Sequence, residues 1–114
     1  MENYSATMDD VFHALANPVR RSVIAHLGRG PASIKQLAAP HALGLPTFLK
    51  HISVLEDSGL IETEKTGRTR VCKLKREQLL AAEKWFEQQR KDWEDRYANL
   101  DHLLIQLKGK IDED

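Results

Sequence analysis

The hydrophobic pattern of the chain predicts several short helices and a strand pair, followed by one long helix. Apolar residues recur every three or four positions in the segments Thr7 to Leu15 and Pro18 to Leu27, the spacing of a buried helix face. Thr7 and Asp10 have the spacing of a capping box, and Asn17 before Pro18 is a favoured helix start. The chain is therefore expected to begin with two short helices.

Two further helical segments follow the break at residues 28–31. Ser33 and Gln36 form a second capping box that opens a brief helix, which ends at the segment 40–44. A longer helix is predicted over residues 45–58, and Gly59 is able to take the left-handed conformation that ends helices. Two such helices joined by a few turn residues are typical of a helix-turn-helix.

A β-hairpin and a long helix complete the pattern. Residues 60–65 and 69–75 contain β-branched residues and flank the turn Thr66-Gly67-Arg68, which predicts two strands. In the second strand Cys72 shares a face with Leu74, so Cys72 is expected to be a small buried hydrophobe.

The helix predicted over residues 76–108 would be about 50 Å long, more than so small a core needs. It carries an apolar stripe with a seven-residue repeat. Such a stripe must be buried, and a second copy of the same helix is the simplest partner. The alternative is a helix that folds only onto its own domain. The predicted dimer interface consists of Phe12, Leu79, Phe86, Trp93, Tyr97, Leu100 and Leu104.

Composition limits the class of protein. The chain has 114 residues, 41% hydrophobic and 30% charged, which suits one globular domain over residues 1–114. No apolar run exceeds four residues, so neither a membrane span nor a signal peptide is expected. The single cysteine excludes an intramolecular disulfide and favours a cytoplasmic location.

Charge is unevenly distributed although the formal net charge is zero. Residues 1–75 carry ten Lys or Arg and seven Asp or Glu, whereas residues 76–114 carry seven and ten. Six basic residues and no acidic one lie between Lys65 and Arg76, which is a local footprint for nucleic acid. The alternative is a solvated, charged hairpin without a partner.

The sequence contains no recognisable catalytic or cofactor motif. The five histidines are scattered, no glycine-rich phosphate loop is present, and the carboxylates of residues 76–108 alternate with Lys and Arg. The sequence therefore predicts a protein that is not an enzyme and has neither a metal nor another cofactor.

Together these elements predict a mainly α protein with a small β-hairpin, a winged helix-turn-helix over residues 7–75 with a long C-terminal dimerisation helix over 76–108. Phe48, Ile52 and Leu55 cluster on a helical wheel and must face the core, so the opposite face would enter the major groove of DNA. The wing would contact phosphate or the minor groove. The candidate DNA-binding residues are Pro46, Thr47, Leu49, Lys50 and Ser53 in the helix, Lys65, Arg68 and Arg70 in the wing, and Arg20 and Arg21, for which surface solvation is equally plausible.

Three stretches resemble the ArsR/SmtB family of bacterial winged-helix repressors. They are VFHALANPVRRSVIAHL (residues 11–27), LPTFLKHISVLEDSGLI (45–61) and WFEQQRKDWEDRYANL (85–100), and the resemblance spans about residues 8–104. It implies a homodimer whose first and last helices pair, and which represses transcription from a palindromic operator in double-stranded DNA.

Two features depart from the family pattern. Residues 33–44 lack the cysteines of metal-sensing members, and Asp101-His102 are adjacent rather than spaced as ligands. Metal sensing is therefore disfavoured, and the effector, if any, is unknown. Leu49 stands where relatives often have a serine. We expect it to contact a thymine methyl group, and packing into the core is the alternative. His51 matches a histidine common in the family, for which a structural hydrogen bond is favoured over base recognition.

Two other functions compete with repression. A winged helix that has lost sequence-specific DNA binding could serve as a protein–protein interaction module, which zero net charge and an exposed Leu49 would suit. RNA binding has less support, because the predicted recognition helix lacks aromatic residues on which bases could stack.

Overall fold

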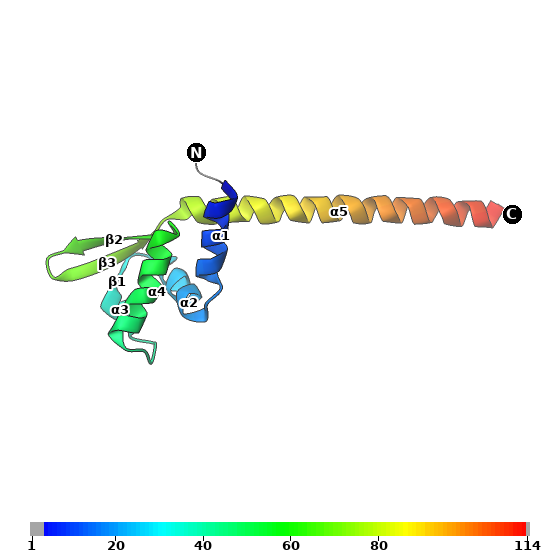
Figure 1. Ribbon diagram of the computed structural model, residues 1–114. Helices are drawn as coiled ribbons and strands as arrows, with labels where there is room; N and C mark the ends of the chain where they lie inside the picture. The colour runs from blue at the N-terminus through cyan, green and yellow to red at the C-terminus, as the bar shows by residue number, and fades with distance from the viewer. Residues whose placement is uncertain (1–3, 114) are drawn as a thin grey trace. The chain divides into compact units, whose positions relative to one another are not determined.

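The computed structural model describes the backbone of residues 4–113 and the side chains of residues 8–110. In chain order its elements are α1 (Tyr4–Leu15), α2 (Pro18–Leu27), β1 (Ala32–Ser33), α3 (Ile34–Ala38), α4 (Leu45–Asp57), β2 (Ile61–Thr66), β3 (Thr69–Leu74) and α5 (Arg76–Glu113) (Figure 1). The chain divides into two compact units, Met1–Ala82 and Glu83–Asp114. This architecture confirms the predicted fold class, a mainly helical protein with a β-hairpin and a long C-terminal helix.

Capping residues explain where α2 and α3 begin. Asn17 Oδ1 accepts hydrogen bonds from the backbone N–H groups of Val19 and Arg20, at 2.9 and 3.2 Å, at the start of α2. Ser33 and Gln36 form the predicted capping box of α3. Helix α1 begins at Tyr4, three residues before the predicted start, and the predicted capping box there lies outside the described residues because it involves the side chain of Thr7.

The sheet has three antiparallel strands in the order β1-β3-β2. The sequence pattern predicted β2 and β3 but not β1, whose two residues pair with Cys72 and Val71. A strand of two residues carries no alternating pattern, and Ser33 belongs both to this strand and to the start of α3. The β2–β3 hairpin turns at Gly67, which has a positive φ of 64°, and reaches beyond α3 and α4 (Figure 1).

The core of the first unit lies between the helices and the sheet. Phe48, Ile52 and Leu55 of α4 are fully buried, as their positions on the helical wheel predicted. Cys72 is also buried and free, and burial raises the pKa of its thiol. It therefore packs as a small hydrophobe. The other members of this core cluster are Val11, Ala14, Val23, Leu27, Ala32, Ile34, Leu37, Leu60, Ile61 and Ala82.

The end of α4 is defined by Gly59. Its backbone has a positive φ of 80°, which favours glycine. The N–H of Leu60 donates to the carbonyl of Leu55 at 3.2 Å, and the N–H of Gly59 donates to that of Glu56 at 3.0 Å, the pattern of a Schellman motif. A Cβ at Gly59 would lie 3.2 Å from Cγ of Gln78. This turn directs the chain from α4 into β2.

The second unit is the C-terminal part of α5. Arg90 forms ion pairs with Glu87 and with Glu94, the latter at 2.9 Å, contacts that support a helix along its polar surface. Large apolar side chains at other positions of the same segment are exposed: Trp85, Phe86, Trp93, Tyr97, Leu100, Leu103, Leu104, Ile105 and Leu107. Within residues 4–113, no helix combines the length and the apolar character needed to cross a membrane.

Candidate nucleic-acid interface

The outer face of α4 is polar and open to solvent in its N-terminal half. Pro46, Thr47, Lys50 and Ser53 are all exposed, while Phe48 on the opposite side is completely buried. Pro46 stands in the first turn, where no backbone donor is needed. The helix therefore presents one cation, two hydroxyl groups and its N-terminal backbone to solvent.

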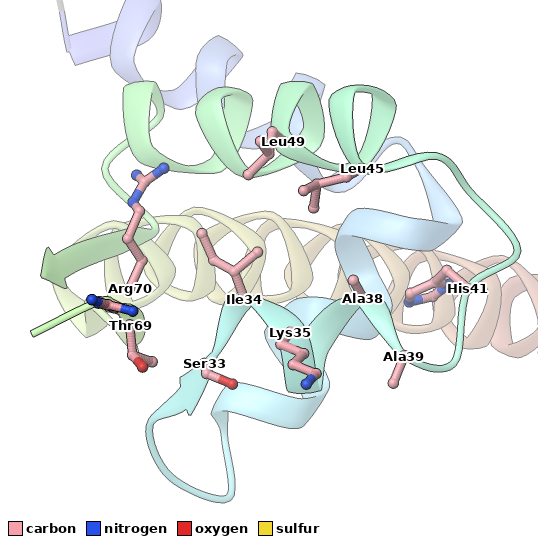
Figure 2. A pocket seen from close by; sticks show the side chains of 11 residues that line it. Ser33, Ile34, Lys35, Ala38, Ala39, His41, Leu45, Leu49, Thr69 and Arg70 are labelled. Atoms are coloured by element: carbon pink, nitrogen blue, oxygen red, sulfur yellow. The ribbon is translucent and has the colours of Figure 1, made fainter. Parts of the chain in front are cut away.

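Leu49 lies at the boundary between this face and the core. It is partly buried and packs against the edge of the core cluster. Figure 2 shows Leu49 and its neighbour Leu45 pointing from α4 toward Ile34 and Ala38 of α3. Of the two roles considered for Leu49, this position favours packing over contact with a thymine methyl group.

The β2–β3 hairpin carries the predicted wing residues. Lys65, Arg68 and Arg70 are exposed, and Lys65 lies directly opposite Arg70 in the strand register. Opposite positions in an antiparallel pair place side chains on the same face of the sheet. The hairpin thus collects three positive charges near its tip.

Arg70 also attaches the hairpin to α4. Its guanidinium donates to Oε1 of Glu56 at 3.2 Å and to Oγ1 of Thr63 at 3.0 Å. The Thr63 hydroxyl in turn donates to Oε2 of Glu56 at 3.1 Å. Because Glu56 offsets part of the charge of Arg70, Lys65 and Arg68 are the stronger candidates for contact with phosphate.

Arg20 is not part of the exposed surface. Its side chain is buried, and its guanidinium donates to the carbonyls of Ala14 at 2.7 Å and His13 at 3.2 Å. The same guanidinium contacts Nδ1 of His51 in α4 at 3.0 Å. The expectation that Arg20 binds phosphate therefore gives way to a structural role. Arg21 is exposed and donates to the carbonyl of Leu15 at 2.8 Å, so it remains a candidate for phosphate.

The contact with Arg20 determines the chemistry of His51. Arginine is always protonated and only donates, so Nδ1 of His51 must accept and the ring proton lies on Nε2. Partial burial and the adjacent Arg20 charge, with a smaller effect of His41, lower the pKa of His51. The imidazole is thus held in one neutral tautomer, which agrees with the structural hydrogen bond favoured from the sequence.

The candidate dimer residues fall into both units. Phe12 and Leu79 are partly buried against the core of the first unit. The other five are exposed along the second unit: Phe86, Trp93, Tyr97, Leu100 and Leu104. Phe86 makes an edge contact with Trp85 at 5.3 Å between ring centroids. In the part of the chain that the structure describes, no three His, Cys, Asp or Glu side chains gather to hold a metal ion.

A helix-turn-helix whose second helix has an exposed polar face, followed by a basic β-hairpin, is the arrangement of the winged helix-turn-helix class of DNA-binding proteins. A helix-turn-helix domain family model matches residues 15–64. The crystal structure of an ArsR family transcriptional regulator is 46% identical, with a TM-score of 0.77, and the match covers 82% of this chain and 97% of that one. The chain belongs to the ArsR family of transcriptional regulators.

Two other relatives extend the comparison. The biofilm growth-associated repressor of Xylella fastidiosa is 29% identical over 65 residues, 57% of each chain. A homodimeric winged helix-turn-helix domain from Mycobacterium bovis has the same fold, with 22% identity, a TM-score of 0.57 and coverage of 65% of this chain and 72% of that one. The matches span only 57% to 62% of the length of the curated relatives.

Replacement of Arg20 should reveal its structural role. Arg20→Gln should lower the free energy of unfolding by about 2–4 kcal/mol, because the buried carbonyl of Ala14 and Nδ1 of His51 lose the charged donors of the guanidinium. The exposed Arg21→Gln variant should cost less than about 1 kcal/mol. Urea denaturation of both variants measures the difference, and equal losses would contradict the assignment.

The His51 contact predicts a pH dependence of stability. Because the folded protein lowers the pKa of His51 below its ordinary value of 6.5, the unfolded chain binds this proton more readily. The stability that neutral His51 contributes is fully present above this ordinary pKa. It is lost as the pH falls through the pKa that His51 has in the folded protein. Between about pH 7.5 and about pH 5.5, the free energy of unfolding measured in urea should therefore fall more for the wild type than for His51→Gln. The amide oxygen of the glutamine still accepts from Arg20 but does not titrate. His13→Gln is the control at an exposed histidine, and equal acid losses in wild type and His51→Gln would refute the interpretation.

Proposed function

We propose that this protein is a homodimeric repressor that binds a palindromic operator in double-stranded DNA. In each subunit, α4 enters the major groove and the β2–β3 hairpin contacts the adjacent backbone or minor groove. The observation that carries the proposal is the exposed polar face of α4 beside a basic hairpin that Arg70 and Glu56 attach to the same helix. Repression is the activity named for the related Xylella fastidiosa protein.

Within α4, the chemistry of the exposed residues suits recognition of DNA. Lys50 reaches a guanine edge or a phosphate, and the hydroxyl groups of Thr47 and Ser53 bond to either. The N-terminus of this helix directs backbone N–H groups outward, which favours a phosphate nearby. These groups supply both a sequence-reading surface and a means of positioning it.

Contacts outside α4 add affinity without reading sequence. Lys65 and Arg68 at the hairpin tip and Arg21 at the start of α2 are exposed cations. Each phosphate that they neutralise releases a counterion, so binding should weaken steeply as salt concentration rises. The formal net charge of zero does not oppose this mechanism, because the positive charges are concentrated in the first unit.

The dimer is proposed from the apolar stripe of α5. Trp93 is 59% exposed and Tyr97 is 68% exposed in the single chain, and exposed aromatic residues along one helix favour burial against a partner. The related Mycobacterium bovis domain is homodimeric. A two-fold dimer presents two copies of α4, which is why the proposed operator is palindromic.

The first test removes Lys50 and Arg68, two cations that are proposed to contact different parts of the DNA. Lys50→Ala should weaken binding to a specific duplex by about 10- to 100-fold through loss of a base or phosphate contact. Arg68→Ala should weaken binding to all sequences and reduce the salt slope by about 1. Fluorescence anisotropy at several salt concentrations measures both effects. Lys91→Ala, an exposed cation of α5, is the control, and DNA affinity unchanged in both test variants would contradict the proposed mechanism.

The second test concerns the dimer. Trp93→Glu should shift the wild-type dimer to monomer in sedimentation equilibrium, because a charge would be buried without a partner in the interface. Trp93 lies outside the core of the first unit, so circular dichroism should still show a folded protein. Lys91→Glu places the same charge at a polar position of this helix and should remain dimeric. A dimer that persists in Trp93→Glu would exclude this interface.

A further inference from the structure

A groove of about 870 Å³ opens between α3, the first turns of α4 and the N-terminal end of β3. Figure 2 shows Leu45 and Leu49 pointing into it from α4 toward Ile34 and Ala38 on the other side. These four side chains give the groove an apolar floor. Its volume lies in the range of small-molecule sites, which are also mainly apolar with a few polar groups at defined positions.

The rim of this α3–α4 groove is positively charged. Lys35 of α3 lines it on one side, and Arg68 and Arg70 of the hairpin line it on another. None of its lining residues is acidic, although Glu56 contacts Arg70 from outside the groove at 3.2 Å. An apolar floor with a cationic rim is complementary to a molecule that has a hydrocarbon body and one anionic group.

DNA would contact the cationic rim of the groove but not its apolar floor. Phosphates would satisfy Arg68 and Arg70, but the sugar-phosphate backbone offers no extended apolar group for the floor. Leu45 is 57% exposed, and it lies outside the polar face that α4 presents to the major groove. The floor therefore has no role in the DNA contacts proposed above.

We propose that the α3–α4 groove binds an amphipathic organic anion, such as a medium-chain carboxylate, and that this ligand weakens DNA binding. The predicted weakening of DNA binding, the regulatory half of the proposal, rests on the proposed function. It is expected because the ligand and the DNA would both contact Arg68 of the hairpin. By linkage, the two ligands reduce each other's affinity by the same factor.

The site is tested first by calorimetry on the DNA-free protein with octanoate, butyrate and 1-octanol. Octanoate should bind at least about tenfold more tightly than butyrate, which has too short an apolar chain. It should also bind at least about tenfold more tightly than 1-octanol, which lacks the charge. Equal affinities for octanoate and 1-octanol, or no binding of octanoate, would overturn the proposal.

Matched variants locate the ligand. Leu45→Ser and Lys35→Gln should each weaken octanoate binding by about fivefold or more, through loss of apolar contact and of charge respectively. Leu43→Ser and Lys73→Gln change an exposed leucine and an exposed lysine outside the groove and should bind octanoate as the wild type does. Thermal unfolding verifies that all four variants are folded. Octanoate affinity unchanged in both groove variants would overturn the assignment.

Competition separates this inference from the proposed function. Octanoate should displace a fluorescent duplex, obtained by selection, from the wild type and less effectively from Lys35→Gln. Octanoate that binds in the groove without displacing the duplex would overturn the regulatory half. A wild type that binds octanoate but no duplex would instead contradict the proposed function, and the calorimetric evidence for the site would stand.

Discussion

The arrangement of the helix-turn-helix depends on one buried cation. Arg20 belongs to α2, and its guanidinium donates to the carbonyls of His13 and Ala14 near the end of α1 and contacts His51 of α4. A buried charge is tolerated only when its donors are used, so any arrangement that separates these three helices leaves donors unpaired. The consequence for function is that the orientation of α4, and with it the exposed face proposed to read DNA, is coupled to the helices behind it.

A second set of polar contacts positions the wing relative to α4. The carboxylate of Glu56, near the end of α4, accepts hydrogen bonds from Thr63 of β2 and from Arg70 of β3. Surface ion pairs contribute little to stability, so the significance of this contact is geometric. It fixes the hairpin relative to α4, and the α3–α4 groove is lined by residues of both. A ligand in that groove would therefore act on the position of the hairpin relative to α4, the two elements proposed to contact DNA, as well as on the charge of Arg68.

The pattern of the sequence predicted much of this fold because periodicity and capping are local. Helix α4 was expected over residues 45–58 and runs over Leu45–Asp57. The buried positions of Phe48, Ile52 and Leu55 followed from their helical spacing. The contacts of Arg20 were missed, because no local pattern links it to a histidine 31 residues later. Strand β1 was missed because it is only two residues long. Leu49 illustrates the same limit: its place on the wheel is local, but its packing against the core edge depends on α3.

Selection of bound duplexes from a random DNA pool tests the central claim most directly, because the selection itself yields the operator sequence. A two-fold dimer with α4 in successive major grooves should enrich an inverted repeat whose half-sites are centred about 10 base pairs, or a multiple of that, apart. Enriched duplexes should lose affinity when either half-site is changed. A pool that remains random after repeated selection, or that converges on a single unrepeated half-site, would contradict the account.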